Sequence, residues 1–307
     1  MVGRHPNRDM RGVMWVALSA VAYSLFPVFT KNVLEEGLTA IDLVVWRFVI
    51  AVPVAWLVVF ARARRGGAGA NQAPILPMTG LGVLFGLLAW LAFAGLEHLP
   101  AALYTVIIYT YPAMVAVGAR VLGRPAPKAL WGALVVTMAG IALTVPQVFS
   151  SNDADVTGLV LTLLNALLYA VYILVSSRLM VPSPRRLKRF DGLVASAWSL
   201  TGSLLFALGL VVFADVRVPD TSRAWFGLIG LAMVSTVLAG SSLMLGLTSL
   251  EPAMAATIAT LEPVLTLVWA MLLLGETLGA VQVGGAALVL AGVSWAQRTH
   301  VVSTVAV

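Results

Sequence analysis

The sequence contains no cysteine, so disulfide bonds, thiolate metal sites and a cysteine nucleophile are excluded. Histidine is scarce as well: His5, His98 and His300 are far apart and lack the spacing of metal ligands. We therefore expect no metal and no other cofactor. The chain also has no H-E-x-x-H, no paired aspartates in an apolar stretch and no serine with a positioned histidine. It is therefore not expected to be an enzyme.

Charge is the second scarcity. Charged residues make up 10% of the chain, against roughly 25% in an ordinary soluble domain. Hydrophobic residues make up 60%, and the mean hydropathy is +0.98. Apolar stretches of roughly 17 to 25 residues, long enough to cross a bilayer, recur about ten times. We predict an all-α integral membrane protein with ten transmembrane helices in the lipid bilayer. The stretches lie near residues 12–31, 41–61, 77–96, 100–119, 129–147, 157–177, 191–213, 224–248, 252–274 and 279–297.

Lysine and arginine gather in cytoplasmic loops, so their distribution predicts the orientation. Of the 19 basic residues, those outside the helices lie mostly on the side of the N-terminus. We therefore predict that the tails 1–11 and 299–307 are both cytoplasmic, in a multi-pass protein of the plasma or inner membrane. The first stretch is too long for the apolar core of a signal peptide and is interpreted as a retained helix. Nucleic acid is not an expected partner, because the basic residues are spread over short segments without interleaved aromatics.

The two halves of the chain resemble each other. The stretch after Pro112 resembles the stretch after Pro263, and at the front of each half Tyr23 aligns with Tyr169. Glycines continue the register, allowing for one extra residue in the second half. The pairs are Gly123 and Gly275, Gly132 and Gly284, and Gly140 and Gly292.

This similarity divides the chain into a first repeat, residues 12–149, and a second repeat, residues 150–298. An odd number of spans in each repeat places the start of the second repeat on the opposite side of the membrane. The predicted architecture is therefore two inverted five-helix repeats. Inverted repeats are typical of secondary transporters, which bind substrate between the halves near the middle of the membrane.

The second repeat carries L-E-P in the ninth span, L-G-E at its end, and then Gln282, Gly284, Gly285 and Gly292. In these features it resembles an EamA domain of the drug/metabolite transporter superfamily, and the tandem arrangement extends the resemblance to nearly the whole chain. It implies a ten-helix carrier that usually exports small metabolites, amino acids or drugs, with spans five and ten at the periphery. The first copy has Tyr111 where the second has Glu262, and Arg124 where the second has Glu276, so the two copies are not expected to contribute the same chemistry.

All six tyrosines lie in the first, fourth and sixth spans, mostly far from the span ends. A hydroxyl group at that depth needs a partner, so we expect these side chains to face the interior of the bundle. Helical spacing places further polar and aromatic residues on the same faces. The alternative is that they only pack one helix against another. The predicted substrate-binding residues are Trp15, Ser19, Tyr23, Phe26, Trp90, Tyr109, Tyr111, Asn165, Tyr169, Tyr172 and Ser241.

Glu262 lies near the middle of the ninth span, where a carboxyl group is costly. The helical rise places Arg47 of the second span at a depth from which it could reach Glu262. In a structural interpretation, the two form a buried ion pair or satisfy backbone groups freed by Pro263. In a functional one, burial favours the neutral carboxyl group, and Glu262 takes up a proton as substrate leaves or meets a substrate ammonium group. A neutral Glu262 bonded to a tyrosine is a further alternative.

The fifth and tenth spans carry faces of small residues without buried charge. Such faces let helix backbones approach closely. The contact lies either within one chain or between two copies in a homodimer, and the sequence does not choose. The residues are Gly132, Val136, Ala139 and Gly140 in the fifth span, and Gly284, Gly285, Leu288, Ala291 and Gly292 in the tenth.

Together these features predict a secondary active transporter that exports a small amphipathic metabolite, such as an amino acid or an organic cation, by alternating access with proton coupling. The alternative within transport is import of a nucleotide-sugar, a sugar phosphate or a vitamin. Organic phosphates need several cations, whereas the chain offers one buried arginine, Arg47. Outside transport, the alternatives are an intramembrane enzyme and a membrane scaffold, and a scaffold would not need tyrosines that face a glutamate.

Overall fold

The computed structural model describes residues 6–69, 71–99, 101–123, 128–144, 155–180, 190–274 and 279–305. These residues form helices joined by short loops, with no strand among them. The helices are α1 (Pro6–Ser24), α2 (Phe26–Leu34), α3 (Ala40–Ala63), α4 (Ile75–His98), α5 (Ala101–Ile108), α6 (Tyr111–Val121), α7 (Lys128–Thr144), α8 (Val156–Met180), α9 (Gly192–Val211), α10 (Ser222–Ala232), η2 (Met233–Leu238), α11 (Ala239–Leu247), α12 (Pro252–Ala259), α13 (Leu261–Leu274) and α14 (Ala280–Val305).

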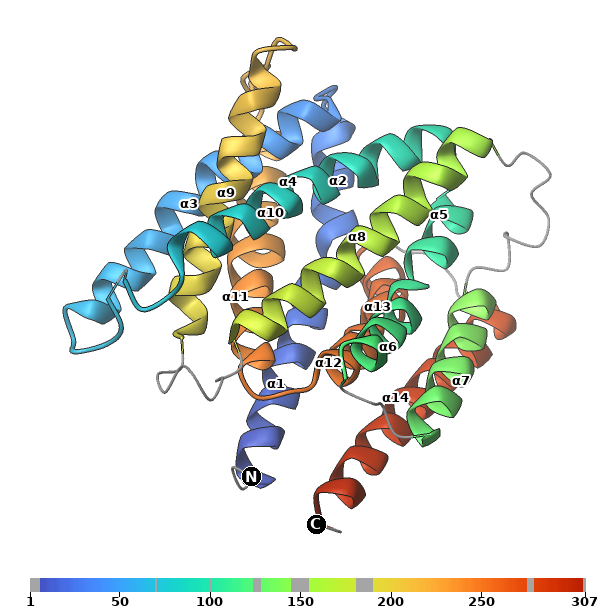
Figure 1. Ribbon diagram of the computed structural model, residues 1–307. Coiled ribbons are helices and arrows are strands. Elements are labelled where there is room, and N and C mark those ends of the chain that lie inside the picture. Colours follow the sequence, from blue (N-terminus) through green and yellow to red (C-terminus); the bar gives the residue numbers. More distant parts are fainter. Residues whose placement is uncertain are drawn as a thin grey trace.

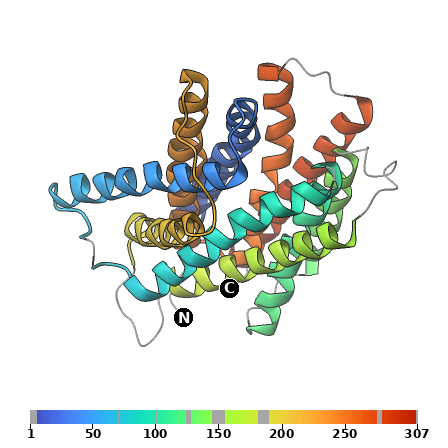
Figure 2. The same cartoon turned by 90° about the horizontal axis from the view of Figure 1, so that it is seen from above.

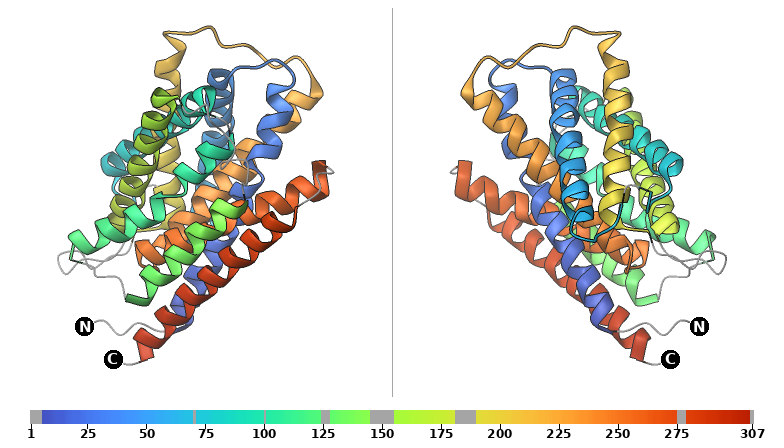
Figure 3. Two further views of the ribbon diagram at one scale, coloured as in Figure 1. Left: turned by 90° about the vertical axis from the view of Figure 1, so that its right-hand side faces the viewer. Right: turned by 90° about the vertical axis from the view of Figure 1, so that its left-hand side faces the viewer.

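The helices form one bundle, in which α4 packs along both α8 and α9 (Figure 1). Figure 2 shows the same bundle from above, with the helices crossing one another at large angles. The N-terminal end of α1 and the C-terminal end of α14 lie at the same end of the bundle (Figures 1 and 3). This placement agrees with an even number of membrane crossings.

Length and composition identify several membrane spans within the described residues. Six segments are long and apolar enough to cross a membrane, and three shorter apolar helices accompany them. The chain is therefore a multi-pass membrane protein, while the full count of ten spans stays a prediction. The six are Met10–Leu34, Ala40–Ala63, Ile75–Gly95, Val156–Met180, Gly192–Val211 and Ser222–Leu247, and the shorter ones are Val106–Val121, Lys128–Thr144 and Ala280–Ala296.

Three of the predicted spans are each made of two helices that meet just before a proline. Proline has no backbone N–H, and its ring clashes with the carbonyl group four residues earlier, so the helix is interrupted on its N-terminal side. The breaks fall at Leu25 before Pro27, at Tyr109 and Thr110 before Pro112, and at Thr260 before Pro263.

A hydroxyl side chain lies beside each break and bonds the backbone there. Ser24, Thr110 and Thr260 donate to the carbonyl oxygens of Val21, Ile107 and Thr257, respectively. Serine and threonine commonly satisfy backbone groups that an interruption frees inside a membrane. The chain therefore supplies a local partner for the backbone at each break.

A fourth irregularity lies in η2, a π-helical segment between α10 and α11. The Thr236 hydroxyl donates to the carbonyl oxygen of Leu231 at 2.7 Å, and the Ser235 hydroxyl donates to that of Ala22 in α1 at 2.8 Å. Segments of this kind are frequent at functional sites. Here the Ser235 hydroxyl joins the widened turn to α1, whereas the Thr236 hydroxyl bonds within its own span.

The contacts between the two halves follow the internal repeat. Gly158 at the start of α8 packs against Leu99 after α4, and Gly12 in α1 packs against Leu250 after α11. More broadly, α8 contacts α4 and α6, whereas α1 contacts α11 and α13. A two-repeat architecture fits these paired contacts.

The fifth and tenth predicted spans, α7 and α14, pack against each other at the edge of the bundle (Figures 1 and 3). A Cβ atom at Gly140 would lie 2.7 Å from the backbone nitrogen of Val289, and one at Gly285 would lie 2.6 Å from that of Thr144. Part of the small-residue face is therefore used within the chain. The remainder points outward, since Ala139, Gly284, Leu288 and Ala291 are exposed.

Candidate functional site

The breaks bring polar side chains together between the helices. Tyr23 precedes the first break, Tyr109 lies in the second, Tyr111 directly follows the second, and Glu262 follows the third. Helix α1 contacts α12 and α13, and α6 contacts α8 and α12, so these positions face a common region. Tyr23 and Tyr111 both lie close enough to Glu262 for its charge to act on them.

Four tyrosine rings form a continuous series, here called the tyrosine arc: Tyr109, Tyr111, Tyr169 and Tyr172. Their successive ring centroids are 6.2, 4.7 and 6.2 Å apart. The Tyr111 and Tyr169 rings meet edge to face at 69°. Within the described residues the Tyr111 hydroxyl is buried without a hydrogen-bond partner, so the arc contains an unused polar group.

Glu262 lies at one end of the tyrosine arc. Its carboxylate accepts a hydrogen bond from the hydroxyl of Tyr109. The side chains of Glu262, Tyr23 and Tyr169 are half-buried although they lie among the helices, so each retains accessible surface. No ion pair of the described residues includes Glu262.

Arg47 lies in α3 and is buried, with 4% of its surface exposed. Its Nε donates to the hydroxyl of Thr236 at 2.6 Å, and its Nη2 donates to the carbonyl oxygen of Ser235 at 3.3 Å. The rings of Phe26, Phe48 and Phe85 surround the guanidinium group, with centroids 5.3 to 5.7 Å from Cζ.

The predicted ion pair between Arg47 and Glu262 is therefore not formed in this structure. Helical rise gives the depth of a residue along its helix but not the sideways separation of two helices. It also does not reveal the oxygen atoms of η2 that accept hydrogen bonds from Arg47. Glu262 instead has the tyrosine partner that the sequence analysis kept as an alternative.

Three of the predicted polar residues make hydrogen bonds between helices. Ser19 donates to the carbonyl oxygen of Ala239 at 2.8 Å, and Ser241 donates to Ser196 at 3.1 Å. The amide nitrogen of Asn165 donates to the hydroxyl of Tyr104 at 3.1 Å. These side chains thus already have a packing role beside the tyrosine arc.

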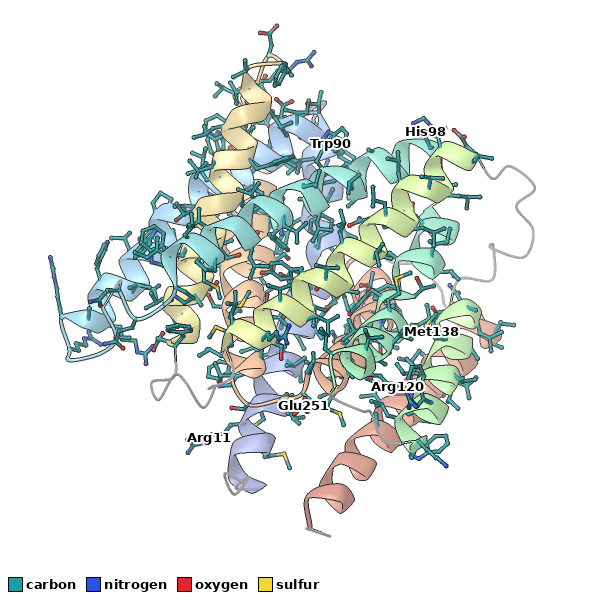
Figure 4. The ribbon with its side chains drawn as sticks, in the orientation of Figure 1. Arg11, Trp90, His98, Arg120, Met138 and Glu251 are labelled. Carbon is teal, nitrogen blue, oxygen red and sulfur yellow. The ribbon has the colours of Figure 1, made fainter. Side chains whose placement is uncertain are left out.

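The three remaining predicted substrate-binding residues, Phe26, Trp15 and Trp90, have different surroundings in the structure. Phe26 packs against both Arg47 and Phe93. Trp15 and Trp90, in contrast, are 39% and 38% exposed, and no ring contact of the described residues includes either of them. Figure 4 shows Trp90 towards the His98 end of α4, away from Glu251 at the opposite end of the bundle.

Sequence reasoning missed the surroundings of Arg47. Phe48 and Phe85 carried no signal, because a phenylalanine in an apolar span is usually a packing residue. Ser235 and Thr236 could have been found, since adjacent hydroxyl residues deep in an apolar span need partners. Ser199, whose hydroxyl is 3.5 Å from that of Tyr172, was also missed, although the same signal could have found it.

Comparison with known proteins identifies the family. The sequence profile of the EamA-like transporter family matches residues 10–145 and again residues 156–296. The chain is 25% identical over 300 residues to the "Uncharacterized transporter YcbK" of Bacillus subtilis (strain 168), covering 92% of this chain and 93% of that protein. It is 27% identical over 268 residues to the "Threonine/homoserine exporter RhtA" of Escherichia coli (strain K12), covering 86% of this chain and 81% of that protein.

A third relative is the "Probable amino-acid metabolite efflux pump" of Salmonella typhimurium (strain LT2), which is 27% identical over 71% of this chain and 76% of that protein. A solved crystal structure supports the fold alone, at 16% identity and a TM-score of 0.77 over 94% of this chain and 96% of that one. Because the two family matches together cover most of the sequence, the chain belongs to the EamA-like transporter family and is a multi-pass membrane transporter.

Proposed function

We propose that the protein is a ten-span secondary transporter that exports an amino acid or a related metabolite in exchange for protons, with Glu262 carrying the proton. The observation that carries the proposal is Glu262 itself. It lies in an apolar helix, accepts a hydrogen bond from Tyr109 and has no cation partner among the described residues. An ionisable group at such depth in a membrane is expensive, and its presence indicates a function.

The architecture supports this proposal. Secondary transporters bind substrate at the interface of two repeats, where interrupted helices provide polar groups. Here the tyrosine arc includes part of the interrupted span α5–α6, α6 contacts α12 of a second interrupted span, and α12 contacts α1 of the third. We assign the repeats to residues 12–149 and 150–298, with both termini in the cytoplasm of a cell whose plasma or inner membrane holds the protein.

Competition for one carboxylate would couple the two fluxes. An ionised Glu262 attracts the ammonium group of a substrate, whereas a protonated Glu262 is neutral and does not. A proton entering from outside therefore releases the substrate there, and loss of that proton to the cytoplasm restores the binding form. Each transport cycle then exchanges one substrate for one proton.

The relatives suggest the substrate class and the direction. One is named for export of threonine and homoserine, and another for efflux of amino-acid metabolites. The site is consistent with such molecules, because it combines aromatic rings, hydroxyl groups and one acid. Organic phosphates fit less well, since Arg47 is the one buried arginine of the described interior.

Reconstituted proteoliposomes test the proposal. We expect the wild type to exchange labelled L-threonine or L-homoserine, and an imposed pH gradient to accelerate this flux. Glu262→Gln should abolish the acceleration while leaving the melting temperature of the purified protein close to that of the wild type. The matched control is Glu251→Gln, because Glu251 lies in a second L-E-P tripeptide at the end of the bundle (Figure 4).

The control variant should respond to the pH gradient as the wild type does. Undiminished gradient-driven flux in Glu262→Gln would remove the proton role. Equal losses in both variants would show that any loss of an acid in or next to this predicted span impairs the protein.

A further inference from the structure

Arg47 is a buried cation without an anionic partner. Its two hydrogen-bond acceptors are the neutral oxygens of Thr236 and Ser235, and its Nη1 has no hydrogen-bond partner among the described residues. The buried acid on the same helix is Asp42. Its carboxylate accepts hydrogen bonds from the backbone N–H of Arg217 at 2.7 Å and from Thr39. Arg47 therefore keeps a positive charge that no described carboxylate neutralises.

Such an arrangement is expensive in a membrane. Transfer of an ion out of water is costly unless a counter-charge and hydrogen bonds replace the water. Cation–π attraction to the faces of Phe26, Phe48 and Phe85 offsets part of this desolvation cost. Aromatic faces do not satisfy the remaining N–H donors, and a planar guanidinium group is suited to bind a carboxylate through two such donors.

Arg47 and Glu262 border the same group of side chains. Arg47 donates to the carbonyl oxygen of Ser235, and the Ser235 hydroxyl holds the carbonyl oxygen of Ala22, next to Tyr23. The charges of both Arg47 and Glu262 act on Tyr23, so both lie near it.

Aromatic rings make a second connection between the two charges. Phe85 lies over Arg47 at 5.7 Å, and its ring centroid is 5.5 Å from that of Tyr172. Tyr172 begins the tyrosine arc, and Tyr109 at the other end of the arc donates to Glu262. The positive charge of Arg47 thus lies at one end of a series of aromatic rings, and Glu262 lies at the other end. The unpartnered hydroxyl of Tyr111 lies within this series.

We propose that Arg47 binds the carboxylate of the transported molecule, so that the substrate is a zwitterion held between Arg47 and Glu262. This inference rests on the proposed function, because it assumes that the tyrosine arc is the transport site. The carboxylate occupies the free donors of Arg47, and the ammonium group approaches the ionised Glu262. A substrate that lacks either charge leaves one protein charge unpaired and binds more weakly.

Three ligands separate these contributions. L-Homoserine carries both charges, its methyl ester retains only the ammonium group, and N-acetyl-homoserine retains only the carboxylate. Dissociation constants are measured with the purified full-length protein at a pH at which the ammonium group of each amine is charged. The wild type should bind L-homoserine about ten- to a hundredfold more tightly than either derivative, as expected for loss of hydrogen bonds to a charged group.

Variants assign each preference to a residue. Arg47→Gln should weaken binding of L-homoserine about ten- to a hundredfold and leave binding of the methyl ester unchanged. Glu262→Gln should weaken the methyl ester and leave N-acetyl-homoserine unchanged. Arg62→Gln is the control, because Arg62 is an exposed arginine of the same helix, paired with Asp191. It should bind all three ligands as the wild type does.

The outcomes distinguish the two proposals. If L-homoserine and L-threonine neither bind nor exchange, the proposed function fails, and this inference fails with it. If L-homoserine binds but its methyl ester binds equally well, only the inference about Arg47 is overturned. Should Arg47→Gln not fold, the wild-type comparison of acid and ester still decides, and Arg47→Lys should retain the preference for the acid.

Discussion

Glu262 and Tyr111 occupy the same position in two interrupted spans, each directly before the proline that follows the break. The two spans also pack together, since α6 contacts α12. The same backbone geometry therefore presents an acid from one repeat and a phenol from the other. This asymmetry gives the site one group able to change charge, with neutral hydroxyl groups around it.

The hydroxyl of Tyr111 leads to the first prediction. It is buried without a partner among the described residues, so its removal in Tyr111→Phe relieves an unsatisfied polar group. The variant should be as stable as the wild type, or more stable by about 1 kcal/mol. If this hydroxyl binds substrate, the KM for exchange of L-threonine should rise several-fold. Thermal unfolding and proteoliposome exchange measure the two effects.

Tyr104→Phe is the matched control for that change, because the Tyr104 hydroxyl accepts a hydrogen bond from Asn165. Its loss leaves the buried amide group without an acceptor and should cost about 1 kcal/mol of stability. A destabilised Tyr111→Phe variant would instead show that the Tyr111 hydroxyl has a structural partner.

The sequence predicted the class of fold, whereas the composition of the site stays a prediction. Periodicity and charge indicated a helical membrane protein, and the alignment of Pro112 with Pro263 indicated two related repeats. Depth within a span then singled out Glu262 and the tyrosines. All of these signals are local, because they depend on spacing along one helix or on the similarity of two segments.

The missing part was the relation between helices. Depth alone suggested a bond between Arg47 and Glu262, yet Arg47 turns towards η2, and nothing in the sequence announced a π-helical turn. Likewise, Trp15 and Trp90 are each more than a third exposed and make no ring contact with the tyrosine arc, although helical spacing had grouped them with the site. Rotation and lateral separation of helices follow from packing across the whole bundle, which a single sequence does not display.

Asp155, outside the apolar spans and directly before α8, gives a prediction about pH. The backbone N–H of Thr157 lowers the pKa of its carboxyl group, and the facing His98 ring lowers it further. A lowered pKa in the folded state means that ionised Asp155 contributes stability above its ordinary pKa of about 4, and that this contribution is lost as the pH falls through the lowered value.

Asp155→Asn should therefore lower the melting temperature modestly at pH 7, because both groups are exposed. The difference from the wild type should persist down to about pH 4 and shrink below it, where the wild-type carboxyl group becomes neutral. The control is Asp220→Asn, which changes an exposed acid in the loop before α10 that makes no ion pair among the described residues. A gap between Asp155→Asn and the wild type that widens in acid would contradict this assignment.

Two adjacent glycines of α14 provide the last prediction. A methyl group at Gly285 would lie 2.6 Å from the backbone nitrogen of Thr144, whereas nothing lies within 4 Å of one at Gly284. Gly285→Ala should force α7 and α14 apart and cost about 1–3 kcal/mol, as overpacking of a tight contact does. Gly284→Ala should be neutral or slightly stabilising, because alanine favours a helix over glycine by up to about 1 kcal/mol.

Thermal unfolding of the two variants tests the difference, and the mass of each purified particle shows whether the outward face joins two copies. Equal melting temperatures would mean that the two helices are not in such close contact, and a lower mass for Gly284→Ala alone would show that the exposed face holds two copies together.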